Sequence, residues 1–139
     1  MTQEDKELLL RDLCGRLPYG VEVEYNNSSC EVLSIDKDNK ELTIWKCYGY
    51  KPDVKLEEVK PYLFPMSSMT EEQEEELKNI YYSFNGMFQY TERIFDKIPF
   101  SKMKYFPYQI EEFFNRNHFD YRGLIPKGLA KDATGLNIY

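Results

Sequence analysis

Near the start of the chain, apolar residues recur at three- and four-residue spacing, which is the period of an amphipathic helix. They are Leu9, Leu10, Leu13 and Leu17, with charged residues around them. Asp5 stands three residues after Thr2, which is the spacing of a capping box. We expect Gly15 and Pro18 to end this helix at about residue 17.

From Gly20 onward the period changes to two, which indicates β-strands. The stretch VEVEY alternates apolar residues with glutamates, and the turn signals NNSS and DKDNK separate it from CEVLSI and ELTIWKCY. We interpret GYKPD as a break, followed by a short strand over 54–56 and a tight turn before Pro61. Four or five short strands predict a small antiparallel β-barrel or curled sheet. This layout resembles an SH3-like barrel, in which a helical turn precedes the last strand.

The second half of the chain is aromatic-rich and has helical periodicity. Thr70 with Gln73 predicts a capping box at the start of a helix, and TERIFDKI predicts a second helical piece that stops at Pro99. A third helix would bury the stripe Ile110, Phe113 and Phe114. We therefore predict an α+β protein in which a helix and small barrel (1–66) and a helical region (67–139) pack as one unit.

Composition limits the function classes. A length of 139 residues fits one domain, and a net charge of −6 disfavours binding to duplex DNA or RNA. It fits a protein that docks on a basic surface. Three cysteines and one histidine, without a C-x-x-C motif, predict neither a disulfide framework nor a zinc site, and we expect no cofactor. Without a signal-peptide core or a long apolar run, we expect a cytosolic chain that does not enter membranes.

A partner-binding surface is predicted in ELTIWKCYGY. Trp45, Tyr48 and Tyr50 would lie at one end of the expected barrel, where SH3-like barrels often form their binding groove. Amphipathic aromatic residues are enriched at protein interfaces. The alternative is that Trp45 belongs to the core, as single tryptophans often do.

A ligand site is the alternative prediction for KIPFSKMKYFPY. Lys102, Lys104, Tyr105 and Tyr108, with Arg122, would combine aromatic faces and cations that stack on and neutralise a nucleotide or another small molecule. The competing interpretation is that the phenylalanines are core and the lysines are solvated.

The only histidine lies in NHFDYRGLIPKGLA, where His118, Asp120 and Arg122 would share a face of an extended segment. A histidine beside a carboxylate is the beginning of a general base, so a small hydrolase using His118 and Asp120 is one alternative. The sequence offers neither a nucleophile elbow nor a second histidine. We therefore favour a structural motif in which Asp120 pairs with Arg122 or caps a turn, and a positive His118 ring closes the preceding helix.

Three stretches together carry a family resemblance: MTQEDKELLLRDLCGRLPYG, VKPYLFPMSSMTEEQ and NHFDYRGLIPKGLA. They resemble a family of short uncharacterised proteins from anaerobic gut bacteria and their phages and mobile elements. The resemblance covers both ends and the centre of the chain and transfers no catalytic residue. It implies a small cytosolic accessory protein, borne by a phage or prophage.

The sequence thus predicts a non-catalytic binding protein that acts through a protein–protein surface to inhibit or modulate a host system. Its expected partner is a host protein. The alternatives are a protein that sequesters a nucleotide or small molecule, and the small hydrolase. The oligomeric state is left open.

Overall fold

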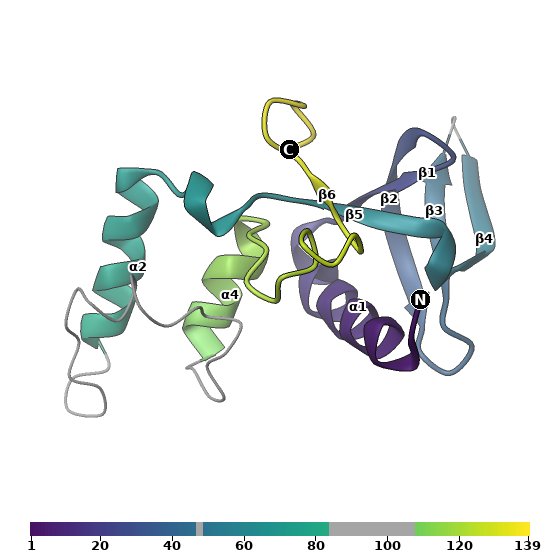
Figure 1. Ribbon diagram of the computed structural model, residues 1–139, viewed down its shortest axis with the longest axis horizontal. Helices are drawn as coiled ribbons and strands as arrows, with labels where there is room; N and C mark the ends of the chain where they lie inside the picture. The colour runs from purple at the N-terminus through teal and green to yellow at the C-terminus, as the bar shows by residue number, and fades with distance from the viewer. Residues whose placement is uncertain (47–48, 84–107) are drawn as a thin grey trace.

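The computed structural model describes residues 1–46, 49–83 and 108–139. The helices are α1 (Gln3–Arg16), α2 (Glu71–Ser83) and α4 (Tyr108–Arg116), and the 3₁₀ turns are η1 (Leu17–Tyr19), η2 (Leu56–Glu58) and η3 (Met66–Ser68). The strands are β1 (Glu22–Tyr25), β2 (Ser28–Asp36), β3 (Glu41–Lys46), β4 (Gly49–Lys55), β5 (Val59–Leu63) and β6 (Lys131–Asp132). Figure 1 shows the sheet with α1 at one end of the molecule and α2 beside α4 at the other.

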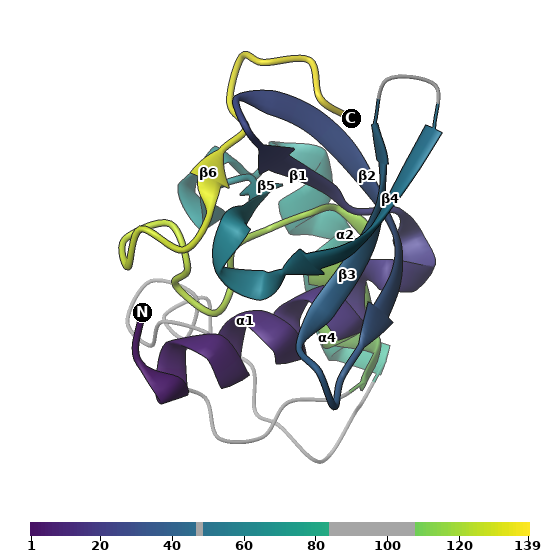
Figure 2. The same ribbon diagram turned by 90° about the vertical axis from the view of Figure 1, so that its right-hand side faces the viewer.

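The six strands form one open sheet in the order β4-β3-β2-β1-β5-β6. The pairs from β4 to β5 are antiparallel, whereas β6 runs parallel to β5. The α+β class and the helical turn before β5 are as predicted. Of the two predicted forms, a barrel or a curled sheet, the closed barrel is wrong, and the sheet is mixed and not wholly antiparallel. β6, from the C-terminal tail, pairs with β5 on the edge that β1 leaves free, and β4 remains an edge strand (Figure 2).

The interpretation of GYKPD as a break is also wrong, because these residues belong to β4. Pro52 lacks a backbone N–H, yet an edge strand tolerates proline because one row of its N–H groups faces solvent. The β3–β4 register shifts nearby, between Leu42 and Ile44, and Asp53 has a φ of 58°. The predicted strand at 54–56 is divided: Val54 and Lys55 end β4, and Leu56 begins η2.

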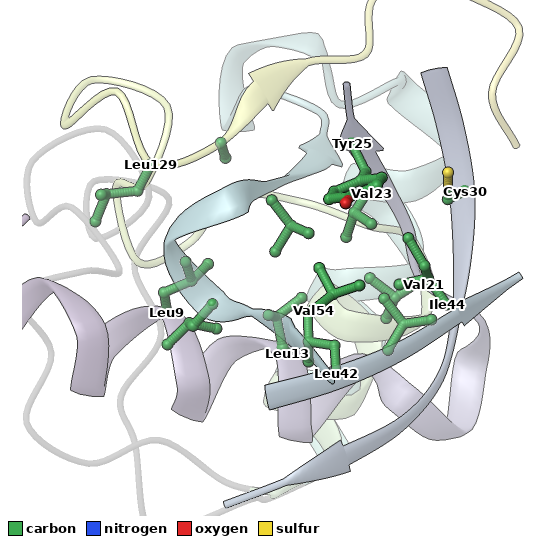
Figure 3. Packing of buried hydrophobic residues seen from close by; sticks show 14 of the residues in the cluster. Leu9, Leu13, Val21, Val23, Tyr25, Cys30, Leu42, Ile44, Val54 and Leu129 are labelled. Atoms are coloured by element: carbon green, nitrogen blue, oxygen red, sulfur yellow. The ribbon is translucent and has the colours of Figure 1, made fainter. Parts of the chain in front are cut away.

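Helix α1 begins at the predicted capping box. The Asp5 amide donates to the Thr2 hydroxyl at 3.1 Å, and the Thr2 amide donates to the Asp5 carboxylate at 3.4 Å. Figure 3 shows Leu9 and Leu13 pointing from α1 toward strand residues such as Val54. Together they form the first core cluster, which holds Leu9, Leu13, Val21, Val23, Tyr25, Cys30, Val32, Leu42, Ile44, Val54, Leu56, Val59, Leu63, Leu124, Leu129 and Ala130.

A second cluster lies between α2 and α4. It holds Leu77, Ile110, Phe113, Phe114, Phe119 and Tyr121, and includes the whole predicted stripe of α4. The predicted capping box of α2 is present, because the Gln73 amide donates to the Thr70 hydroxyl at 3.2 Å. The predicted piece TERIFDKI lies outside the described residues. The segment after α4 supplies Phe119 to the second cluster and Leu124 to the first, so it joins the two cores.

Candidate functional site

The outer face of β3 and β4 carries a pair of exposed aromatic residues. Trp45 and Tyr50 are direct partners in the β3–β4 register, so their side chains lie next to each other on the same face. Trp45 is 45% exposed and Tyr50 is 71% exposed. The hairpin that holds them is at the end of the molecule opposite α2 and α4 (Figure 1). Tyr48, predicted with them, lies outside the described residues.

Two carboxylates continue the row of this aromatic pair. Trp45 is also the register partner of Glu31 on β2, and Glu31 is the partner of Glu22 on β1. Glu22 accepts a hydrogen bond from the Ser29 hydroxyl at 2.7 Å. The exposed Glu31 side chain has neither an ion pair nor a hydrogen bond within the described parts of the chain. We call these four residues, Glu22, Glu31, Trp45 and Tyr50, the outer row.

The sequence-predicted motif at His118, Asp120 and Arg122 lies elsewhere, where the segment after α4 crosses α1 and the end of β5. Phe64 and Phe119 form an isolated parallel bridge. The Phe64 amide donates to the His118 carbonyl and the Asp120 amide to the Phe64 carbonyl, both at 2.8 Å. Backbone hydrogen bonds therefore hold the motif against the residue that follows β5.

A fully buried arginine completes this region. The Arg16 guanidinium donates to Asp12 at 2.7 and 3.0 Å and to the Phe119 carbonyl at 2.6 Å. Arg122, only 15% exposed in its side chain, lies 3.3 Å from Asp12 and donates to Glu111 at 2.8 Å. We call this set of residues the polar junction: Asp12, Arg16, Glu111, Asn115, His118, Asp120, Tyr121 and Arg122.

Asp120 caps the turn that follows it. Its two carboxylate oxygens accept backbone hydrogen bonds from the Leu124 amide at 2.7 Å and the Ile125 amide at 2.8 Å. Burial raises the pKa of Asp120, and the two amides act against this rise. Of the two expected roles, the carboxylate thus takes the turn cap, while Arg122 pairs with Asp12 and Glu111.

His118 follows α4 at a left-handed φ of 61°. Its ring stacks on the ring of Tyr139, with centroids 3.5 Å apart and planes inclined by 9°. Burial, with a smaller contribution from the Arg16 charge, lowers the pKa of His118 to about 4. His118 therefore closes α4 with a ring that is neutral near pH 7, because loss of solvation outweighs the preference of a helix end for a positive charge.

Tyr121 holds the centre of the polar junction. Its hydroxyl lies 3.1 Å from the Asn115 side-chain oxygen and 3.2 Å from Glu111, and burial raises its pKa. The Arg122 and Arg16 guanidinium groups lie 4.6 and 5.4 Å from the centre of its ring. These contacts fix the tyrosine in place.

This geometry offers little support for a general base made of His118 and Asp120. Within the described residues, no hydrogen bond joins His118 to Asp120, and the His118 Nδ1 atom is buried without a partner. Both oxygens of Asp120 already accept backbone amides. In the same described ranges, no group of three or more histidine, cysteine, aspartate or glutamate side chains is placed to hold a metal ion.

Residues of the predicted ligand site are spread out. Lys102, Lys104 and Tyr105 lie outside the described residues. Tyr108 opens α4 and is 69% exposed, whereas the Arg122 guanidinium is held by two carboxylates. Among residues 1–46, 49–83 and 108–139, no hydrogen bond, ion pair or ring contact joins Tyr108 to Arg122.

Sequence reasoning missed Asp12 and Arg16, and it missed the pairing of Glu111 with Arg122. A signal was present for the first two, because Leu9, Asp12, Leu13 and Arg16 have the spacing of one helix face. An aspartate and an arginine at i and i+4 on a buried face are an ion pair that needs a third partner for the remaining guanidinium hydrogens. The Phe119 carbonyl accepts one of these hydrogens, while the Arg16 Nη1 atom is buried without a hydrogen-bond partner among the described residues.

In the part of the chain that the structure describes, no helix combines the length and the apolar character needed to cross a membrane. Comparisons with protein-family models, with curated proteins and with solved structures each gave no match.

Proposed function

We propose that this chain is a non-catalytic binding protein that acts through a protein–protein surface at the outer row. The observation that carries the proposal is the exposed pair of Trp45 and Tyr50, side by side on adjacent strands. Tryptophan and tyrosine dominate the binding energy of protein interfaces, where their large rings become fully buried. Isolated exposed apolar residues are common, but an adjoining tryptophan and tyrosine with Leu33, also exposed, on the next strand favour a docking surface.

The state of the polar junction supports a role without catalysis. His118 is neutral and stacked on Tyr139, and the Asp120 carboxylate is occupied by a turn. Arg122 is paired with two carboxylates. These side chains join α1, α4 and the C-terminal tail, so the single histidine serves packing.

The partner in this proposal is a host protein, and the chain is a small cytosolic factor, borne by a phage or mobile element, that inhibits or modulates a host system. The family resemblance and the net charge of −6 support it. We further propose that β1–β5 have an SH3-like strand arrangement, but form an open sheet instead of a closed barrel. Consecutive strands from β1 to β4 are neighbours, β5 pairs with β1, and η2 precedes β5, as in that fold.

The test is quantitative capture from host lysate by the immobilised full chain. We expect the wild-type chain to capture a specific protein, and the Trp45→Ser/Tyr50→Ser variant to lose most of it. The control is Tyr108→Ser, which removes an equally exposed tyrosine from α4 and should capture as the wild type does. Equal capture by all three chains would contradict the proposal. A small molecule found by native mass spectrometry in place of a protein would contradict it too.

A further inference from the structure

We infer that the partner segment bound at the outer row carries a cation, with arginine preferred over lysine. Its guanidinium would lie over the rings of Trp45 and Tyr50 and pair with Glu31. This inference rests on the proposed function and adds the chemistry of the occupant.

The geometry of the outer row leads to this chemistry. Direct partners in an antiparallel sheet have Cβ atoms about 5 Å apart, so Glu31, Trp45 and Tyr50 form a continuous strip of one carboxylate and two aromatic rings. Aromatic faces attract cations through their quadrupole, and tryptophan does so most strongly. A carboxylate beside them gives the same cation a second, charged partner.

Two lysines near the strip have partners other than Glu31. The Lys46 ammonium lies 4.9 Å from the centre of the buried Tyr25 ring. Lys131 pairs with Glu24 at 3.2 Å. Glu31 has no side-chain partner in the described ranges, and Glu22, the next residue of the row, adds a second negative charge. The net charge of −6 attracts the same kind of partner from a distance.

The free edge of β4 is a poorer docking site than the face. Pro52 removes a backbone donor from this edge strand, and Asp53 adopts a φ of 58°. A proline and an irregular backbone are features by which natural edge strands avoid pairing with another strand. The occupant is therefore expected to contact side chains across the face and not to extend the sheet.

Arginine suits the strip better than lysine. A guanidinium is planar, so it stacks on a ring while its N–H groups still reach a carboxylate at the side. An ammonium group is more strongly hydrated and loses more on leaving water. The polar junction shows the same arrangement within this chain, where Arg122 lies 4.6 Å from the centre of the Tyr121 ring and donates to Glu111.

Trp45 is the only tryptophan of the chain, so its fluorescence reports directly on this strip. The experiment titrates the full chain with a short unstructured peptide of arginine and serine. A parallel titration uses the same peptide with citrulline, which keeps the shape of arginine without its charge. We expect saturable binding of the arginine peptide and binding about tenfold weaker for the citrulline peptide. Equal affinities would overturn the inference.

Two pairs of variants place the binding on the strip. Glu31→Gln should weaken the arginine peptide by about threefold or more, whereas Glu71→Gln, which changes the net charge equally at an exposed position on α2, should leave it unchanged. Tyr50→Ala should weaken it by about tenfold, and Tyr108→Ala should not. If Glu71→Gln had the effect of Glu31→Gln, net charge alone would explain binding and the inference would fail.

The inference can fail while the proposed function holds. Capture of a host protein through Trp45 and Tyr50, with no binding of the arginine peptide, would leave the function in place and overturn the cationic partner. Dimerisation of the purified chain that is lost in Trp45→Ser/Tyr50→Ser would also overturn it, because the occupant would then be a second copy.

Discussion

The outer row and the polar junction are built from the same kinds of residue, aromatic rings beside carboxylates, and they differ in how their charges are balanced. In the polar junction, Asp12 faces both Arg16 and Arg122, and Glu111 faces Arg122. In the outer row, Glu31 has no such partner among the described residues, and its neighbour Trp45 is exposed.

This difference distinguishes charged groups that stabilise the fold from charged groups that a partner can bind. A carboxylate that is buried must be paired within the chain, because the cost of an unpaired buried charge is several kcal/mol. A carboxylate beside exposed rings carries no such requirement and remains open to a partner. The residue types alone therefore made both regions candidate sites. The pairing of their charges within the chain is what distinguishes the two.

The largest expected effect comes from breaking the buried ion pair. Asp12→Ala leaves the Arg16 guanidinium buried without its carboxylate, and we expect a loss of about 3–5 kcal/mol in the free energy of unfolding. The control Glu76→Ala breaks the exposed pair with Arg116 and should cost no more than about 1 kcal/mol. Urea denaturation of both variants measures this. Similar losses in the two would contradict the structural role of the junction.

The next effect is a pH dependence that follows from His118. Because its pKa is about 4 in the folded chain and 6.5 ordinarily, the unfolded chain binds more protons between these values. The contribution of His118 to stability is complete above pH 6.5 and is lost as the pH falls toward 4, up to about 3 kcal/mol in total.

His118→Asn isolates this contribution. Asparagine tolerates the left-handed φ of this position and does not titrate. The raised pKa of Asp120 has the opposite sign, since its ionisation lowers stability as the pH rises, but it is common to both chains. Urea midpoints measured from pH 7.5 to about 4 should fall more steeply for the wild type. Parallel curves would show that His118 titrates normally.

The smallest expected effect on stability is at the outer row. Trp45→Ser/Tyr50→Ser removes two exposed side chains, and we expect a change within about 0.5 kcal/mol for each. Thermal and urea unfolding of the double variant check this. A large loss would mean that the two rings pack within the fold, and their exposure would then not indicate a docking surface.

Local patterns allowed much of the fold to be predicted. The capping boxes at Thr2 and Thr70 and the buried stripe of α4 depend on residues three or four apart, and each is present. β4 was missed because the tolerance for Pro52 depends on its place at the sheet edge, which only the strand order reveals. β6 was missed because it pairs with a strand almost seventy residues earlier, Tyr62 with Lys131.

The candidate sites show the same limit, because local contacts could be predicted and contacts between distant parts of the chain could not. The Asp120 turn cap joins residues four and five apart, and the sequence predicted a cap or a pair with Arg122 at this residue. The contact of Arg16 with the Phe119 carbonyl spans 103 positions, so no local pattern contains it. Nothing in the sequence indicated that the His118 ring would be neutral, because its burial against Tyr139 is a tertiary property.

The most direct measurement compares one variant from each region in the same capture experiment at pH 7.5, where both are expected to be folded. Trp45→Ser/Tyr50→Ser should lose the partner while keeping the wild-type unfolding curve. His118→Asn should retain the partner at the wild-type level. The reverse result, capture kept by Trp45→Ser/Tyr50→Ser and lost by a folded His118→Asn, would contradict the assignment and place the function at the polar junction.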